Sequence, residues 1–227
     1  IHSHDILHCC LKPSTIYLNE ILFPKIGDFG LSMKFYNPNN LTIQSISGFQ
    51  GLPIYSAPEV LQYNAYSKAS DVYSFAYIVY EIITNEVPFK NINTFNKMMT
   101  EIVFNGNRPE LNESIPKKYR ELIEKCWCQV PDQRMTFEEI TFLLKTDQEF
   151  ITEKINKNSY FKYIEYIEKS SDHESNYKNI SIKQVDATES KMNENLSNPQ
   201  FSIEYCKKIA EDGNVEEQEF LFKKFTK

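Results

Sequence analysis

His8-Cys9-Cys10-Leu11-Lys12-Pro13-Ser14-Thr15 is the most informative stretch of this sequence, and five further motifs follow it in order. The next two are Asp28-Phe29-Gly30 and Ala57-Pro58-Glu59. Further along stand Ser70-Asp71-Val72-Tyr73-Ser74-Phe75, Val87-Pro88-Phe89, and Cys126-Trp127 with Pro131-Asp132-Gln133-Arg134-Met135-Thr136. One short motif is weak evidence, but six in a fixed order are specific.

The motifs resemble the signatures of the C-terminal lobe of protein kinases, which begin with H-R-D-L-K-P-x-N, D-F-G and A-P-E. The pair at 126–136 resembles the C-W-x-x-x-P-x-x-R-P-T signature of the tyrosine-kinase-like group. The resemblance covers about residues 1–147. It implies a mainly α fold, the large C-terminal lobe of a kinase, with two short strand pairs around the catalytic loop and a helical tail. Residues 16–19 and 24–27 are the strands expected to flank this loop.

Two positions of the first motif depart from the kinase pattern. Cys10 stands at the catalytic position where kinases carry the aspartate that accepts the substrate hydroxyl proton. Thr15 stands at the metal position where they carry the asparagine that binds the second Mg²⁺. Losing a general base typically costs about 10²–10⁴ in rate. The resemblance therefore implies a catalytically impaired pseudokinase.

Other positions match the nucleotide-site residues of the family. By resemblance, Asp28 binds a metal, and Lys12 is a catalytic residue that touches the γ-phosphate. Tyr17 stands where many kinases have a leucine under the adenine, so its ring either fills part of that pocket or points elsewhere. ATP and Mg are the cofactors that the resemblance implies.

Scaffold residues of the family are also matched. His8 and Phe29 correspond to members of a stacked hydrophobic spine, and Gly30 completes the D-F-G motif. Asp71 corresponds to the carboxylate that hydrogen-bonds the catalytic-loop backbone. Glu59 and Arg134 correspond to a buried ion pair. We therefore expect structural roles for all six residues.

No upper-lobe motif is found in the sequence. A kinase holds ATP between two lobes, under a G-x-G-x-x-G loop and beside a V-A-I-K lysine. The six glycines fit no such loop pattern. A fragment whose upstream lobe is not in this chain is therefore one interpretation, and it weakens the case for ATP binding by this chain alone.

Composition favours a globular, cytoplasmic protein. The resemblance to a pseudokinase implies that it binds other proteins through its kinase-like lobe and its helical tail. The net charge of −6 argues against nucleic acid as a partner, and no apolar run is long enough to cross a membrane. The five cysteines form no pattern of bridges, which favours a reducing compartment. Cys126 and Cys128 lack a second pair and are not expected to bind a metal.

The sequence predicts helices in the lobe and a change of character beyond it. Apolar residues at helical spacing indicate a buried helix, with Val72, Phe75, Ala76, Val79, Ile82 and Ile83 on one face. A second stripe follows Pro116, and a capping box at Thr136 and Glu139 begins a third helix. Residues 148–169 are expected to form an amphipathic helix, and 170–200 a polar linker.

Residues 201–227 resemble a tetratricopeptide-like repeat of the Sel type, with Gly213 ending its first helix. A simple helical hairpin is the alternative for this end. For the whole chain, two alternatives to a functional pseudokinase stay open: part of an active kinase that another segment completes, and a decaying copy.

Overall fold

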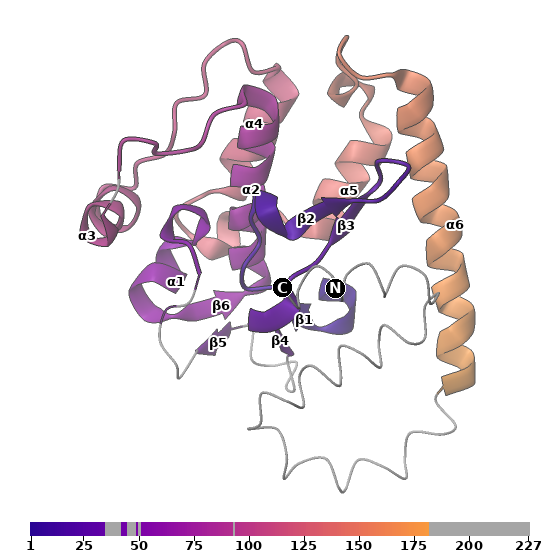
Figure 1. The fold of residues 1–227 in the computed structure, drawn as a ribbon, viewed down its shortest axis with the longest axis horizontal. Coiled ribbons are helices and arrows are strands. Elements are labelled where there is room, and N and C mark those ends of the chain that lie inside the picture. The colour runs from indigo at the N-terminus through magenta and orange to yellow at the C-terminus, as the bar shows by residue number, and fades with distance from the viewer. Residues whose placement is uncertain (35–41, 45–48, 50, 93, 182–227) are drawn as a thin grey trace, which may run out of the picture. The chain divides into compact units, whose positions relative to one another are not determined.

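The structure is a computed structural model that describes residues 1–34, 42–44, 49, 51–92 and 94–181 (Figure 1). The chain divides into two compact units, Ile1–Ile164 and Glu165–Lys227. The second unit is described only as far as Ser181, as part of a helix in which Lys169 pairs with Glu165 at 2.7 Å. The predicted repeat at 201–227 and the later part of the predicted linker lie outside the described residues.

Three antiparallel strand pairs lie in the first unit. β1 (Ile6–Leu7) pairs with β4 (Met33–Lys34), and β2 (Ile16–Leu18) pairs with β3 (Pro24–Ile26). These two pairs enclose the loop of residues 8–15, as the sequence predicts. The third pair, β5 (Thr42–Gln44) with β6 (Ala65–Ser67), is not anticipated by the sequence analysis.

Helices make up most of the remaining first unit. The α-helices are α1 (Pro58–Tyr63), α2 (Lys68–Thr84), α3 (Phe95–Met99), α4 (Lys117–Cys126), α5 (Phe137–Thr146) and α6 (Lys157–Ser181). A π-helical turn, η5 (Thr100–Phe104), continues α3. The 3₁₀ turns are η1 (His2–His4), η2 (Pro13–Thr15), η3 (Phe29–Leu31), η4 (Pro53–Tyr55), η6 (Pro131–Gln133) and η7 (Gln148–Phe150).

Helix α2 is the centre of the core. Ser67 begins it by exchanging side-chain and backbone hydrogen bonds with Ser70, and Asn85 ends it in the left-handed region at φ 55°. The helix is buried on most sides, as predicted. The assignment of Ile82 to the buried face is wrong, because this side chain is 75% exposed.

Two tyrosines fill the middle of that core. Tyr73 and Tyr77 are fully buried, and their hydroxyls lie 3.1 Å apart. The Tyr73 ring contacts two guanidinium groups, Arg134 at 4.9 Å and Arg108 at 5.1 Å from its centroid. Cation–π contacts of this kind contribute most where water is excluded. Tyr73 therefore joins α2 to the segments on either side of α4.

Helix α5 begins at the predicted capping box. The Thr136 hydroxyl accepts from the Glu139 amide at 3.2 Å, and the Glu139 carboxylate accepts from the Thr136 amide at 2.7 Å. Helix α4 begins directly after Pro116 and buries Leu122, Ile123 and Cys126. Both local predictions are confirmed.

The packed unit continues past the boundary expected at residue 147. Phe150 is only 2% exposed, and its carbonyl accepts from the Tyr119 hydroxyl at 2.9 Å. Lys118 pairs with Asp147 at 2.9 Å. Helix α6 begins at Lys157 and reaches Ser181, so its bounds differ from the expected 148–169. Residues 148–164 thus belong to the first unit.

Phe150→Ala is expected to lower the free energy of unfolding by about 3–5 kcal/mol, because it opens a cavity in the core. Urea unfolding followed by circular dichroism measures this change. Phe142→Ala, at a position 65% exposed on α5, is the matched control and should change stability by no more than about 0.5 kcal/mol. Equal effects of the two substitutions would contradict an essential role for residues beyond 147.

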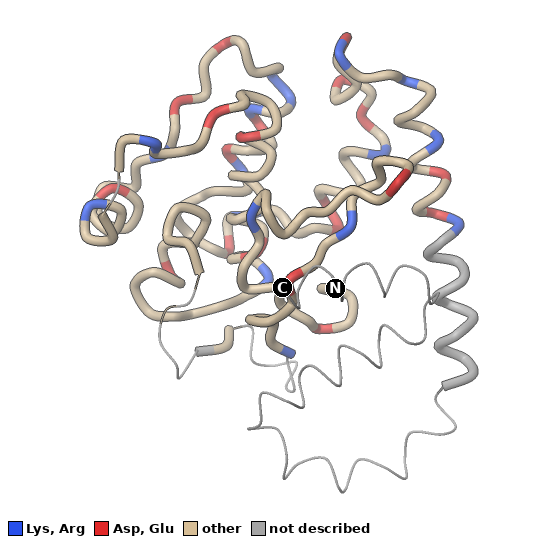
Figure 2. The backbone as a smooth tube through the Cα atoms, in the orientation of Figure 1, with Lys and Arg blue, Asp and Glu red and all other residues tan. Residues whose placement is uncertain are grey.

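Charged side chains of both signs are interspersed along the described backbone (Figure 2). Across the described residues, the helices are too short or too polar to cross a lipid bilayer.

Candidate functional site

Asp71 fixes the backbone of the loop of residues 8–15. It lies in the first turn of α2, is 1% exposed, and accepts hydrogen bonds from the amides of His8 at 2.8 Å and Cys9 at 2.9 Å. The His2 ring contacts the same carboxylate at 2.8 Å. Cys9 has φ 64°, a left-handed conformation that is costly for a cysteine. The bonds to Asp71 hold this strained turn in place.

His8 joins the loop to the segment of residues 27–30. Its Nδ1 accepts from the Cys10 amide at 3.3 Å, so its Nε2–H donates to the Gly27 carbonyl at 2.9 Å. The ring lies 5.0 Å from the Phe29 ring. The structure thus places His8 beside Phe29, and their role as members of a stacked spine stays a prediction.

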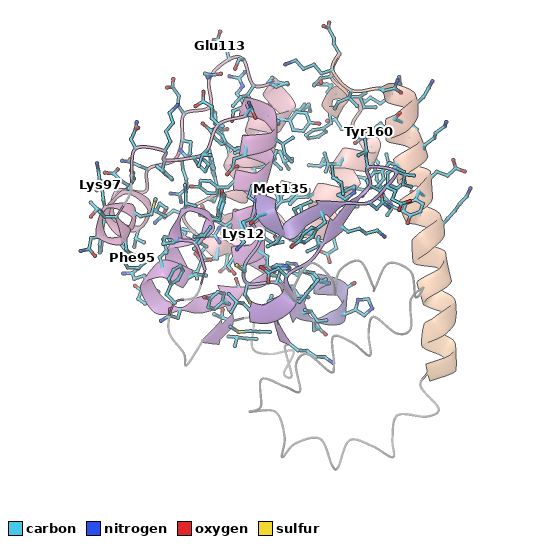
Figure 3. The ribbon with its side chains drawn as sticks, in the orientation of Figure 1. Lys12, Phe95, Lys97, Glu113, Met135 and Tyr160 are labelled. Atoms are coloured by element: carbon cyan, nitrogen blue, oxygen red, sulfur yellow. The ribbon has the colours of Figure 1, made fainter. Side chains whose placement is uncertain are left out.

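Cys10 lines a small pocket beside this loop. Its neighbours there include Lys12, Leu52, Tyr55 and Ser56. Figure 3 labels Lys12, which extends from the same loop. Burial raises the pKa of the Cys10 thiol; the Lys12 ammonium lowers it and the Asp28 carboxylate raises it, with burial the largest effect. The Cys10 side chain is therefore a thiol rather than a thiolate near neutral pH.

The raised pKa predicts the pH dependence of Cys10 alkylation. A thiolate, not a thiol, reacts with iodoacetamide, and an ordinary cysteine has a pKa of about 8.5. Cys10 should react more slowly than glutathione at pH 7.5, and its rate should keep rising as pH passes 8.5. Tandem mass spectrometry, which separates Cys10 from Cys9, measures both rates. A plateau below pH 8 would contradict the prediction.

Thr15 does not present a metal ligand. Its side chain is buried within η2, where the hydroxyl donates to the Lys12 carbonyl at 2.9 Å and accepts from the Lys12 amide at 3.2 Å. These bonds close the loop on itself. That Thr15 replaces the metal-binding asparagine poorly stays a prediction.

Asp28 is exposed, in contrast to Thr15. It precedes η3 with φ 62°, and Gly30, also exposed, lies in that turn. Within the described ranges, no three His, Cys, Asp or Glu side chains converge on a point where a metal could sit. Mg²⁺ in nucleotide sites is typically held by one or two carboxylates together with the phosphates, so Asp28 could be a ligand of such an ion, whereas the Thr15 hydroxyl is bonded to the Lys12 carbonyl.

The Tyr17 ring lies against Gly27. A methyl group built on Gly27 would come within 2.6 Å of Cε2 of Tyr17, which is closer than real atoms approach. Tyr17 is on β2 and Gly27 follows β3, so the ring covers the end of the hairpin that leads to Asp28. A side chain at position 27 would thus require the Tyr17 ring to shift.

Glu59 and Arg134 form a two-pronged ion pair. Arg134 Nη1 and Nη2 donate to the two carboxylate oxygens of Glu59 at 2.6 and 2.8 Å. The Arg134 side chain is 0% exposed and that of Glu59 is 14% exposed. The pair ties α1 to the segment that precedes α5.

Sequence reasoning left out part of the pocket around Cys10. Ser74 lies there and donates to the Tyr55 carbonyl at 2.8 Å, and the Tyr55 hydroxyl donates to Glu81 at 2.7 Å. Ser74 belongs to the motif at 70–75, so its position in that motif was the available signal. Tyr55 and Ser56 had no comparable signal.

A family model settles what kind of domain this is. The model described as a protein kinase domain matches residues 1–146. The chain belongs to the protein kinase family. The loop of residues 8–15, fixed by Asp71 and joined to residues 27–30 through His8, is therefore the catalytic-loop region of a kinase domain.

Relatives of this kinase-family chain occur in Dictyostelium discoideum. A probable LIM domain-containing serine/threonine-protein kinase is 32% identical over 157 residues, which cover 69% of this chain and 23% of that protein. Dual specificity protein kinase shkA is 35% identical over 142 residues, or 62% of this chain and 27% of that protein. The chain thus spans roughly a quarter of the length of these relatives.

Proposed function

We propose that this chain is a pseudokinase of the tyrosine-kinase-like group, a C-terminal kinase lobe that binds proteins and does not transfer phosphate. The observation that carries the proposal is Cys10, a cysteine in the catalytic-loop motif where kinases carry the aspartate that acts as the base. Buried Thr15, hydrogen-bonded to the loop backbone, adds to it. The signature at 126–136 supports the assignment to this group.

The retained scaffold supports a role in binding. Asp71, His8, Phe29, Glu59 and Arg134 all make the contacts described above, so the lobe keeps its shape without its chemistry. Loss of a general base and of a metal ligand removes groups that act on the transition state, whereas it leaves the fold intact.

A phosphoryl-transfer assay tests the first half of the proposal. The full chain is incubated with radiolabelled ATP, Mg²⁺ and a generic acceptor protein. We expect incorporation no higher than that of an Asp28→Ala control, because neither Cys10 nor Thr15 supplies the missing group. Incorporation that depends on Asp28 would overturn the proposal.

Crosslinking in cells tests the second half. Leu52 is 50% exposed at the rim of the Cys10 pocket, so Leu52→Glu should weaken a protein contact there. Val87→Glu, at a position 54% exposed outside the residues that line the pocket, is the control. Crosslinks to specific proteins that survive in the control and fall in Leu52→Glu support the proposal; no change in either would contradict it.

A second candidate is a kinase that works only when an upstream lobe completes it. Exposed Asp28 and the presence of Lys12 favour it. The chain also covers only 23% of the length of one relative, which favours it too. Cys10→Asp with Thr15→Asn should leave the isolated chain inactive in the same assay, because no glycine-rich loop or V-A-I-K lysine is in the sequence. Turnover by this double variant would show that the lobe alone can hold ATP.

A further inference from the structure

Residues that follow the kinase-domain match pack back onto the lobe at several points. Phe150 packs edge-on against Tyr119 of α4, with ring centroids 5.1 Å apart. The Tyr160 hydroxyl donates to the Leu144 carbonyl at the end of α5. Figure 3 labels Tyr160, which lies on α6. Lys157 also donates to Gln148 at 3.2 Å. The segment 147–164 is thus fixed to α4 and α5.

The first turns of α6 also reach the β2–β3 hairpin. Tyr163 packs edge-on against Phe23, with centroids 4.8 Å apart and ring planes at 71°. Phe23 is the residue directly before β3. An edge-to-face aromatic pair contributes about 0.5–1.5 kcal/mol beyond the area that it buries. Tyr163 therefore holds the turn of the hairpin against α6.

The hairpin is itself bonded to the centre of the candidate site. Its turn is closed by Asn19, whose side chain accepts from the Phe23 amide at 2.8 Å. At its far end the Gly27 amide donates to the Thr15 carbonyl at 2.9 Å. The Gly27 carbonyl accepts from His8, and Asp28 comes next. Displacement of the hairpin would therefore also move the backbone of Asp28.

We propose that residues 147–164 form a strap that fixes the β2–β3 hairpin and, through it, the position of Asp28. An event that displaces the first turns of α6 would then loosen the hairpin and the segment 27–30. The strap is a regulatory contact between the C-terminal segment and the catalytic-loop region. It does not depend on whether the chain transfers phosphate.

Hydrogen exchange in the full chain tests the strap. In Tyr163→Ala the amides of Asn19, Phe23 and Gly27 should exchange about tenfold faster, because the contact that holds the turn is lost. The amide of Trp127, bonded to Ile123 at 3.0 Å in α4, should keep its rate. Lys162→Ala, at an exposed position directly before Tyr163 on the same helix, is the control and should leave the hairpin unchanged.

Two further variants keep the test decisive. Phe23→Ala should accelerate the same amides, and combining it with Tyr163→Ala should add little, since both remove one contact. If Tyr163→Ala does not fold, Tyr163→Leu should accelerate the hairpin amides by about threefold. Unchanged hairpin rates would overturn the proposal. Equal acceleration at Trp127 would also overturn it, since the loss would then be global.

Discussion

Arg134→Ala is expected to lower the free energy of unfolding by about 3–5 kcal/mol, because it leaves the Glu59 carboxylate without its partner in the interior. The same substitution removes hydrogen bonds to the carbonyls of Cys128 at 2.8 Å and Ala69 at 3.0 Å. It also removes the guanidinium that contacts the Tyr73 ring. Thermal unfolding and urea titration both measure the change.

A surface ion pair provides the control for Arg134. Lys90 and Glu86 lie 3.4 Å apart, with side chains 64% and 55% exposed. Lys90→Ala should cost less than about 1 kcal/mol, since water and salt screen such pairs. If Arg134→Ala were no more destabilising than Lys90→Ala, the pair with Glu59 would not be a structural tie between α1 and the segment before α5.

Asp71→Ala should cost about 3 kcal/mol or more. The carboxylate accepts from two backbone amides, and each buried donor left unpaired costs about 1–3 kcal/mol. The left-handed turn at Cys9 would also lose the bond that holds it. Urea unfolding measures the loss of stability, and hydrogen exchange at the His8 and Cys9 amides shows whether the loop opens.

Two comparison variants show whether the effect of Asp71→Ala comes from its lost hydrogen bonds. Asp71→Asn keeps one acceptor oxygen and should be less destabilising than Asp71→Ala. Asp132→Ala, at an exposed acidic position, should stay within about 0.5 kcal/mol of the native chain. Full protection of the His8 and Cys9 amides in Asp71→Ala would refute the role of this carboxylate in fixing the loop.

The sequence predicts the site best where a motif fixes both residue type and spacing. His8 and Asp71 are 63 positions apart and Glu59 and Arg134 are 75 positions apart, yet the order of the motifs alone pairs them. Local sequence patterns also predict structure well where the interacting residues are close in the sequence. The capping box at Thr136 and the helix after Pro116 are of this kind.

Prediction from sequence is weaker where packing between residues far apart in the chain decides the structure. Ile82 has the right spacing for the buried face of α2, but burial depends on what lies opposite, and nothing in the described residues covers it well. Phe150 lies outside the motifs, so only its contact with Tyr119 shows that it belongs to the core. The β5–β6 pair likewise joins two segments that carry no strand signal strong enough to predict it.

The contact between Tyr17 and Gly27 has a consequence for how related sequences can vary. Because a methyl group at Gly27 would overlap the tyrosine ring, a larger residue at Gly27 would require the ring to shift or to be replaced by a smaller side chain. Among homologues, a tyrosine at the first position should occur with glycine at the second, and larger residues at the second should occur with smaller side chains at the first. Covariation of this pair would mark the branch of the family in which an aromatic ring covers the end of the hairpin.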